Sequence, residues 1–200
     1  MRIRHSAPRD RERLSEICLR TGDAGADATG LLDDDDLWGL VFVLPYVARH
    51  PDLAWVVEDE RGDAIGYVVG TDDTDGFEDW YRESWWPAHA ARFPRPEAEH
   101  GRQDEIVRYA WGRGATAVPY VGMGYPAHLH IDLLPEAQGR GFGRRLIWTM
   151  IDELRRRGVP GLHLVADARN AGAIAFYDRL GFARLDSPPG DQAFGMRLDG

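Results

Sequence analysis

The sequence predicts an α/β fold: a mixed central sheet with helices on both faces and an aromatic-rich helical insertion, at about residues 72–126, before one strand. Strand and helix patterns alternate through the last third of the chain, an order that packs helices against a sheet. The insertion holds four of the seven tryptophans. A length of 200 residues suits one domain, residues 1–200, with room for a sizeable core.

The first part of the chain supplies a strand, two helix signals and a hairpin. A short strand near Ile3 precedes an amphipathic helix over residues 8–21. Four aspartates at 33–36 precede an apolar run, where we expect them to solvate and cap a helix start; contiguous carboxylates diverge, which argues against a metal site. Residues 54–57 and 64–70, separated by a polar turn, predict a β-hairpin.

The insertion predicts two helices, at about residues 77–92 and 103–113, separated by the prolines of residues 93–96. Its aromatic side chains form either a satellite core or one wall of a pocket, and the two are compatible. The remaining elements follow in order: a strand at 127–134, a helix at 141–158, a strand at 161–166, a helix at 171–180 and strands at 182–185 and 193–197. In such folds sites lie where a strand ends and a helix begins, so the chemistry is expected near residues 130–145.

Charge and composition narrow the class of partner. The 24 Lys and Arg against 33 Asp and Glu give 24 − 33 = −9, which disfavours nucleic acid and anionic membranes and suits an amine-bearing partner. The longest apolar stretch, residues 37–48, is shorter than a bilayer-spanning helix requires. Cys18 is the single cysteine, so no intramolecular disulfide forms, and the polar N-terminal residues lack a secretion signal, which predicts a cytoplasmic protein.

Three glycines alternate where a predicted strand is followed by a helix. Gly139, Gly141 and Gly143 let backbone amides approach an anion, the helix start adds a positive end, and Arg140 and Arg144 add charge, which together suit a pyrophosphate. A glycine-rich turn with a surface arginine face explains the spacing equally well. The arginine after Gly143 excludes a P-loop, and the glycine spacing excludes the dinucleotide fingerprint.

The order Gln138-x-x-Gly141-x-Gly143 at the start of an amphipathic helix resembles the acetyl-CoA pyrophosphate loop of the GNAT superfamily of acyl-CoA-dependent N-acyltransferases. A second match follows the next strand, where Asn170 precedes the aromatic pair Phe176-Tyr177. The resemblance implies the GNAT fold, acetyl-CoA as co-substrate and no metal.

The cofactor-binding residues implied by this resemblance are Leu133, Leu134, Gln138, Gly139, Arg140, Gly141, Phe142, Gly143, Arg144, Asn170 and Phe176. Within the superfamily, Asn170 corresponds to a residue that reaches the pantetheine. The main-chain N–H near Leu133 or Leu134 corresponds to the donor that polarises the thioester carbonyl.

Looser pieces along nearly the whole chain, such as Pro45-Tyr46 and residues 125–132, resemble the acetyltransferase-like domain of eukaryotic O-GlcNAcase and its free-standing bacterial relatives. Eukaryotic members lack parts of the cofactor loop. Because that loop is complete here from Gln138 to Gly143, the resemblance implies that this chain is better equipped to bind acetyl-CoA.

The resemblance makes Tyr177 the proton donor to the coenzyme A sulfur, a role suited to a phenol whose ordinary pKa of about 10 exceeds the thiol value of about 8.5; the alternative is an aromatic packed on the sheet. A catalytic base is less evident, because the usual glutamate of the strand is absent. Alternation places His128, His130 and Asp132 on one face of that strand. They form either a histidine–carboxylate base or a buried polar group that satisfies the backbone, and water could also carry the proton away.

The acceptor pocket has aromatic and acidic candidates, which together could receive a cationic amine. They are Trp38, Tyr46, Trp80, Tyr81, Trp85, Trp86, Asp72, Asp73, Asp75, Glu78 and Asp79. The predicted function is acetyl transfer from acetyl-CoA to a primary amine, on a small molecule or a protein. The alternatives are a noncatalytic acetyl-CoA-binding module and an interaction scaffold. The sequence does not determine the oligomeric state.

Overall fold

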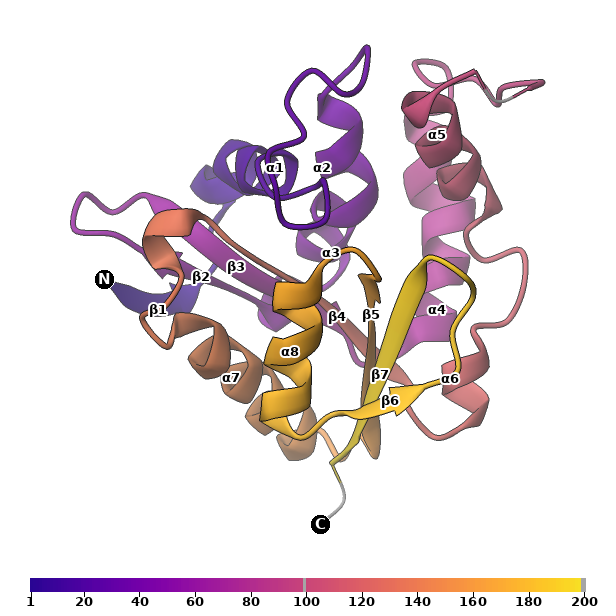
Figure 1. The fold of residues 1–200 in the computed structure, drawn as a ribbon. Helices are drawn as coiled ribbons and strands as arrows, with labels where there is room; N and C mark the ends of the chain where they lie inside the picture. The colour runs from indigo at the N-terminus through magenta and orange to yellow at the C-terminus, as the bar shows by residue number, and fades with distance from the viewer. Residues whose placement is uncertain (99, 199–200) are drawn as a thin grey trace.

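A seven-stranded, mostly antiparallel sheet forms the centre of the protein (Figure 1). The computed structural model describes residues 1–98 and 100–198. The strands lie in the order β1-β2-β3-β4-β5-β7-β6, and the neighbours β4 and β5 are parallel. Their bounds are β1 (Arg2–His5), β2 (Ala54–Glu58), β3 (Ala64–Thr71), β4 (Ala127–Leu133), β5 (Gly161–Asp167), β6 (Ala183–Leu185) and β7 (Asp191–Arg197).

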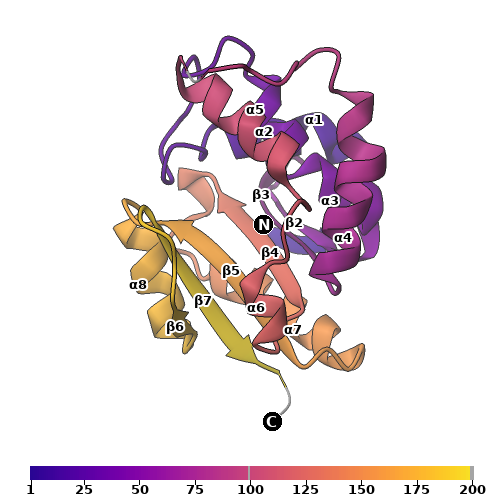
Figure 2. The same cartoon turned by 90° about the vertical axis from the view of Figure 1, so that its right-hand side faces the viewer.

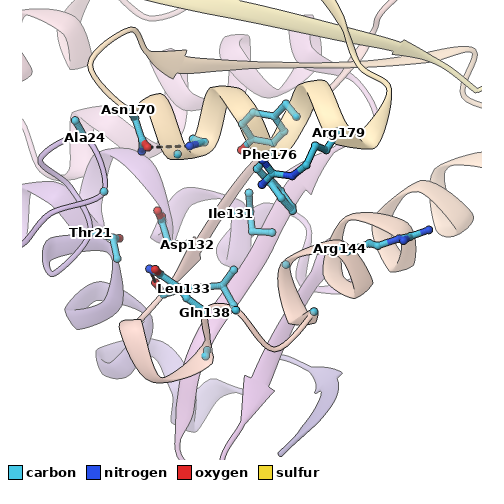
Figure 3. A pocket seen from close by; sticks show the side chains of 18 residues that line it. Thr21, Ala24, Ile131, Asp132, Leu133, Gln138, Arg144, Asn170, Phe176 and Arg179 are labelled. Carbon is cyan, nitrogen blue, oxygen red and sulfur yellow. Dashed lines mark hydrogen bonds between the residues drawn. The ribbon is translucent and has the colours of Figure 1, made fainter.

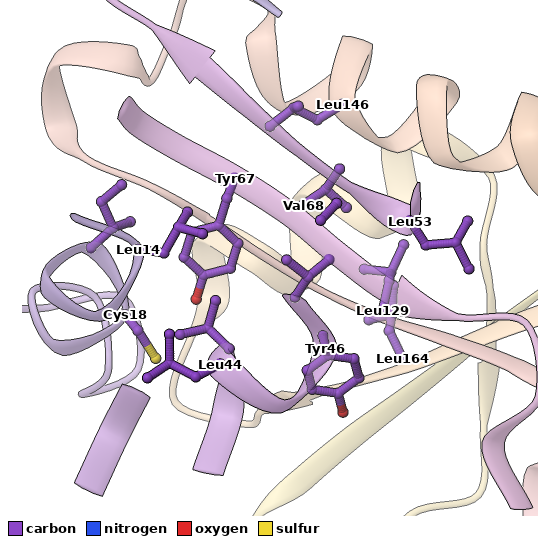
Figure 4. Close-up of a cluster of buried hydrophobic side chains, with 14 of the residues drawn as sticks. Leu14, Cys18, Leu44, Tyr46, Leu53, Tyr67, Val68, Leu129, Leu146 and Leu164 are labelled. Atoms are coloured by element: carbon purple, nitrogen blue, oxygen red, sulfur yellow. The ribbon is translucent and has the colours of Figure 1, made fainter. Parts of the chain in front are cut away.

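Helices cover both faces of this sheet, as the sequence predicts. Tyr67 and Val68 are consecutive in β3 and therefore point to opposite faces. Figure 4 shows Tyr67 beside Leu14 and Cys18 of α1, whereas Val68 faces Leu146 of α7. The helices are α1 (Arg11–Leu19), α2 (Asp36–Phe42), α3 (Leu44–Arg49), α4 (Thr74–Trp80), α5 (Arg102–Gly112), α6 (Pro119–Gly122), α7 (Phe142–Arg156) and α8 (Ala171–Leu180).

The β2–β3 hairpin lies at the centre of the core and is buried along both strands. Its turn forms because the Asp59 carboxylate accepts hydrogen bonds from the amides of Arg61 and Asp63, at 2.8 and 3.0 Å. Gly62 supplies the left-handed residue of the turn, with φ of +91°. The predicted hairpin is therefore confirmed.

The insertion occupies the whole connection between β3 and β4, residues 72–126. The predicted helix at 77–92 is helical over residues 74–88, because α4 continues through one π-helical and one 3₁₀ turn. Figure 2 shows α5 beside α2, and Tyr46 of α3 stacks on Phe77 of α4 with ring centroids 4.3 Å apart. The insertion thus packs on the α2–α3 side of the molecule.

A satellite core holds the insertion in place. The indole of Trp85 donates to the Leu40 carbonyl at 2.9 Å, and that of Trp111 donates to the Phe93 carbonyl at 3.0 Å. Trp86 is buried and stacks on the ring of Tyr81. These contacts confirm the satellite-core interpretation of the insertion's aromatic residues.

The aspartates before α2 meet the expectation in part, because the Asp34 carboxylate accepts from the amide of Asp36, the first residue of α2, at 3.2 Å. Asp35 occupies the N-cap position without a side-chain cap, and its carboxylate accepts from the Gly30 amide instead. Asp34 and Asp36 both pair with Arg92 of the insertion, at 2.7 and 2.8 Å. The run starts a helix as predicted, but its carboxylates mainly fasten the preceding loop and the insertion together.

Candidate active site

Strands β4 and β5 pair only at their beginnings and then separate. Ala127 pairs with Leu162 and His128 with His163, after which β4 stays with β3 and β5 with β7. The separation leaves two adjoining clefts of about 540 and 320 Å³, which we call the cradle cleft (Figure 3) and the second cleft. The residues common to both are Thr21, Ala24, Gly25, Ile131, Asp132, Asn170, Ala173 and Tyr177.

Backbone amides of β4 point alternately toward β3 and toward the gap. The Leu134 amide donates to the Ile65 carbonyl of β3 at 3.0 Å. By alternation, the amides of Leu133 and Ile131 point to the side from which β5 has separated. Leu133 therefore offers a donor to the gap, whereas Leu134 does not, because its amide is engaged and its side chain is fully buried.

The predicted anion cradle is a turn that opens α7. Gly139 and Gly141 have φ of +68° and +78°, in the left-handed region that glycine favours. No described side chain caps α7, so its first amides can bind an anion. The side-chain amide of Gln138 donates to the Leu133 carbonyl at 2.8 Å. Gln138 thus fastens the turn to the end of β4.

At Gly143 the start of α7 approaches both walls of the cradle cleft. A Cβ atom there would lie 3.1 Å from Cδ1 of Leu133 and 3.3 Å from Cζ of Phe176. Such spacing is tighter than ordinary van der Waals contact. Glycine at this position therefore keeps the cleft open between the end of β4 and α8.

The cationic side chains near the cradle divide into two groups. Arg144 and Arg179 line the cradle cleft, whereas Arg140 is exposed and lies outside its lining. Phe142 is buried in the core, so a contribution to anion binding would come from its amide. Arg179 was not among the predicted residues, because the Asn170 to Tyr177 motif of the same helix does not specify a cationic residue.

Asn170 is the N-cap residue of α8. Its side-chain oxygen accepts a hydrogen bond from the Ala173 amide at 2.9 Å, drawn dashed in Figure 3. Gly25 lies so close that a Cβ atom there would be 2.9 Å from Nδ2 of Asn170. The loop after α1 and the start of α8 therefore meet where the two clefts adjoin.

Asp132 and Tyr177 line both clefts. The Tyr67 hydroxyl of β3 donates to Oδ2 of Asp132. Burial raises the pKa of Asp132 to about 6, against the opposing effect of that hydrogen bond. Burial and the Asp132 carboxylate raise the pKa of Tyr177. Near neutral pH the carboxylate is available to accept a proton, and the phenol keeps its own.

The second cleft combines aromatic and charged side chains. His130, Trp38 and Phe42 belong to its lining. Asp167 and Asp191 stand directly opposite each other on β5 and β7, and both line this cleft. Like charges in opposed cross-strand positions repel, which favours a cation at this edge. Arg169 already pairs with Asp167 at 2.8 Å, and Arg102 also lines the cleft, so Asp191 is the carboxylate of this pair that we assign to a bound cation.

His128 lies outside both clefts, in contrast to its predicted place among the catalytic residues. Its Nε2 lies 2.7 Å from the Tyr46 hydroxyl and its Nδ1 lies 2.8 Å from the Thr74 hydroxyl. Burial lowers the pKa of His128 well below the ordinary value. Both ring nitrogens are engaged, which removes His128 from the candidate bases.

The expected acceptor wall also needs correction. Trp80, Tyr81, Trp85 and Trp86 line neither cleft, because they pack within the satellite core, and of the predicted aromatic residues Trp38 alone lines the second cleft. The acidic residues of the insertion are mostly engaged elsewhere: Asp72 pairs with Arg157, Asp73 caps α4, Glu78 pairs with Arg113 and Asp79 pairs with Arg82. The acceptor side is built mainly from β4, β5, β7 and α2, and the insertion contributes Arg102 of α5 to its lining.

Two contributions could not be anticipated from motifs. Thr21, Ala24 and Gly25 reach the clefts from the loop after α1, where Ala24 has a φ of +51°. Tyr67 meets Asp132 through the β3–β4 register, across the 55-residue insertion. The described residues contain no cluster of three or more metal-ligating side chains and no helix with the length and apolar character to cross a membrane.

Residues 29–182 match the acetyltransferase (GNAT) family, and the chain belongs to that family. A crystal structure of SsHAT is 42% identical with a TM-score of 0.94, and the match covers 100% of this chain and 98% of that chain. The structure of yncA from Salmonella typhimurium with its cofactor acetyl-CoA is 19% identical with a TM-score of 0.57, and the match covers 100% of this chain and 95% of that one. This second likeness concerns the fold.

Among curated relatives, the mycothiol acetyltransferase of Renibacterium salmoninarum is 29% identical over 163 residues. The match covers 78% of this chain and 39% of that protein. The chain spans less than half the length of the mycothiol acetyltransferases that it matches.

Proposed function

We propose that the protein is an acetyl-CoA-dependent N-acetyltransferase whose acceptor is a primary amine, on a small molecule or a protein. One observation carries the proposal: the gap between β4 and β5 joins an anion cradle to a carboxylate and a phenol that both line its two clefts. Membership of the GNAT family supports the choice of acetyl-CoA, and the acetyl-CoA-bound neighbour supports it through a shared fold.

The residues present fit acetyl-CoA. The amides at residues 139–144 would hold the pyrophosphate, since the left-handed glycines and the uncapped helix start leave them open. Arg144 and Arg179 would add charge, and Phe176 and Asn170 would border the pantetheine. The Leu133 amide would donate to the thioester carbonyl.

Acetyl-CoA supplies an acetyl group activated as a thioester and leaves as the thiol. Asp132 takes one proton from the bound ammonium and releases it to solvent, which frees the nitrogen lone pair. Tyr177 gives its proton to the departing sulfur as the C–N bond forms and the C–S bond breaks. The nitrogen loses a second proton to solvent, and Tyr177 is reprotonated, so one proton is released in net.

The second cleft supports an acceptor that arrives as a cation. Asp132 and Asp191 contribute carboxylates there, and Trp38 and Phe42 contribute aromatic faces. The charge of the third carboxylate, Asp167, is offset by Arg169 and Arg102. The formal charge of −9 supports an acceptor that is neither nucleic acid nor membrane-bound. The narrower resemblance to the O-GlcNAcase domain and the cytoplasmic location stay predictions.

A calorimetric titration with acetyl-CoA, beside free coenzyme A, tests the proposal first. We expect one-to-one binding with a dissociation constant of roughly micromolar, or about −8 kcal/mol. Thiol release is then followed across small amines, aminosugars and lysine peptides. Cys18, the single cysteine, is buried with a raised pKa, so the protein adds little thiol background.

The outcomes separate the alternatives. Binding with thiol release supports the transferase. Binding without release from any acceptor favours a noncatalytic acetyl-CoA-binding module. The absence of binding overturns the proposal and favours an interaction scaffold.

A further inference from the structure

A buried chain of hydrogen bonds runs from the insertion to the second cleft. It begins at Thr74, whose hydroxyl lies 2.6 Å from the Pro126 carbonyl and 2.8 Å from Nδ1 of His128. It continues from Nε2 of His128 to the Tyr46 hydroxyl at 2.7 Å, and from that hydroxyl to Nε2 of His130 at 3.1 Å. Three elements, α4, α3 and β4, thus contribute to one chain of hydrogen bonds, which ends at the imidazole of His130.

The direction of every proton in this chain follows from its first member. A carbonyl oxygen has no proton, so the Thr74 hydroxyl must donate to Pro126. Nδ1–H of His128 therefore donates to Thr74, which leaves Nε2 of a neutral His128 as an acceptor for the Tyr46 proton. With its only proton committed, Tyr46 accepts from Nε2–H of His130.

Arg113 reinforces this order. Its Nη2 donates to the Tyr46 oxygen at 3.3 Å, while Nη1 donates to the Val41 carbonyl at 2.9 Å and Nε donates to Glu78 at 3.0 Å. A guanidinium has no lone pair to offer, so the Tyr46 oxygen is the acceptor here as well. Burial, Arg113 and His163 lower the pKa of His130 to about 3, which keeps that ring neutral.

The remaining nitrogen of His130 opens into the second cleft. Nε2 is directed to Tyr46, and Nδ1 has no hydrogen-bond partner within residues 1–98 and 100–198. Nδ1 is also not one of the buried polar atoms left unpaired in those residues. Because His130 lines the second cleft, beside Asp132 and Tyr177, a lone pair faces the place where an acceptor would sit.

We propose that Tyr46 is a positioning residue that fixes the Nε2–H tautomer of His130, so that Nδ1 accepts a hydrogen bond from the acceptor amine and orients its lone pair. This role rests on the proposed N-acetyltransferase function. It is distinct from proton removal: Asp132 takes the proton, and His130 holds the nitrogen by one remaining N–H. The amine acceptor is recognised as a donor, so a tertiary amine with no N–H left after deprotonation would not be held.

Imidazole nitrogen NMR of the unliganded wild-type protein tests the tautomer without any reaction. We expect His130 with a protonated Nε2 and an unprotonated Nδ1 at pH 7. The opposite tautomer would overturn the proposal, and this result does not depend on whether the protein transfers acetyl groups. Tyr46→Phe should lose the single-tautomer signature. Tyr120→Phe should keep it, because that variant removes a partly buried hydroxyl that donates to the Asp186 carbonyl and lies outside both clefts.

Two substitutions of His130 separate orientation from packing. Asn places an amide near the Nδ1 position and can still accept from the amine, whereas Gln places its amide near Nε2 and keeps the Tyr46 contact. We expect His130→Gln and Tyr46→Phe to raise KM for the amine about tenfold with acetyl-CoA affinity unchanged, and His130→Asn to retain most of the wild-type KM. Equal KM values in all three variants would overturn the role. A wild-type protein that binds acetyl-CoA but transfers nothing would overturn the proposed function instead, with the tautomer result still standing.

Discussion

The two sides of the β4–β5 gap are built by different means. The cradle is built mainly of backbone, namely two left-handed glycines, an uncapped helix start and an amide of β4, with the side chains of Arg144 and Arg179 in its lining. The second cleft depends on side chains whose positions are set by buried hydrogen bonds from β3, α3 and the insertion. We therefore expect changes of backbone geometry to alter the affinity for acetyl-CoA. The loss of single polar atoms should instead alter KM and kcat for the acceptor amine.

The largest effect should come from breaking the cradle. Gly141→Glu places a side chain at φ of +78° and a carboxylate where a pyrophosphate would lie, so backbone strain and charge repulsion act together. We expect acetyl-CoA affinity to fall at least about 100-fold in a calorimetric titration.

Gly62→Glu provides a matched control for that substitution. Gly62 also has a positive φ, +91°, with open space around it, but it lies in the β2–β3 turn. If a glutamate with positive φ lowers the stability of the fold in general, it does so in both variants. Acetyl-CoA affinity, however, should be unchanged in Gly62→Glu. Equal losses of affinity would show that the cradle is not the binding site.

A smaller effect should follow from Asp132→Asn, which leaves the cradle intact. Without the carboxylate, the acceptor ammonium keeps its proton, and we expect kcat to fall about 100-fold with acetyl-CoA affinity unchanged. In the wild type kcat should rise with pH through about 6, as Asp132 ionises, and this limb should vanish in the variant. The pH profile of kcat at saturating amine measures both.

Asp191→Asn is the companion variant on the same side. It removes a carboxylate of the second cleft that we place near the acceptor's charge and away from proton transfer. KM for a cationic amine should rise with the pH limb of kcat preserved. If the rise of kcat through about pH 6 were lost in Asp191→Asn but kept in Asp132→Asn, Asp191 would be the proton acceptor and Asp132 the residue that attracts the cation.

Tyr177→Phe should have a still smaller effect, since water can protonate a thiolate whose ordinary pKa is about 8.5. We expect kcat to fall about tenfold, with acetyl-CoA affinity and the limb near pH 6 unchanged. Single-turnover release of coenzyme A is the suitable measurement. An unaltered rate in Tyr177→Phe would reduce that residue to a packing role against Phe182 and Phe194.

Sequence reasoning succeeded where function is carried by local backbone. The glycines at 139, 141 and 143 determine a turn within a few residues. Helical and alternating patterns predicted the seven strands in their order and most of the helices, although the short helices α3 and α6 were not predicted separately. Asn170 was found through the family resemblance, and the structure adds that it is the N-cap residue of α8.

The acceptor side could not be predicted in the same way, because it depends on pairs distant in the chain. Tyr46 and His128 are 82 residues apart, and Tyr67 and Asp132 are 65 apart. The sequence placed the polar residues His128, His130 and Asp132 on one face of β4. Which of them faces a cleft depends on the side chains that pack against each one. Aromatic density in the insertion indicated burial, and composition alone does not distinguish a satellite core from a pocket wall.

The smallest effect concerns stability, and it separates the side-chain network from the cradle. The pKa of buried His128 is depressed in the fold, so the unfolded chain binds a proton near pH 6.5 that the native state refuses. Its contribution to stability is therefore present above pH 6.5 and lost as pH falls. Asp132, with its pKa raised to about 6, acts in the opposite direction and offsets part of that loss.

Between pH 7 and 5.5 we expect His128 to account for about 1 kcal/mol of lost unfolding free energy, measured by urea denaturation. In His128→Gln the amide can still accept from Tyr46 but does not titrate, so the pH slope should become shallower by that amount. An identical slope in the variant would mean that His128 is protonated within the native fold, and the proton order assigned to the Thr74–His130 chain would then be lost.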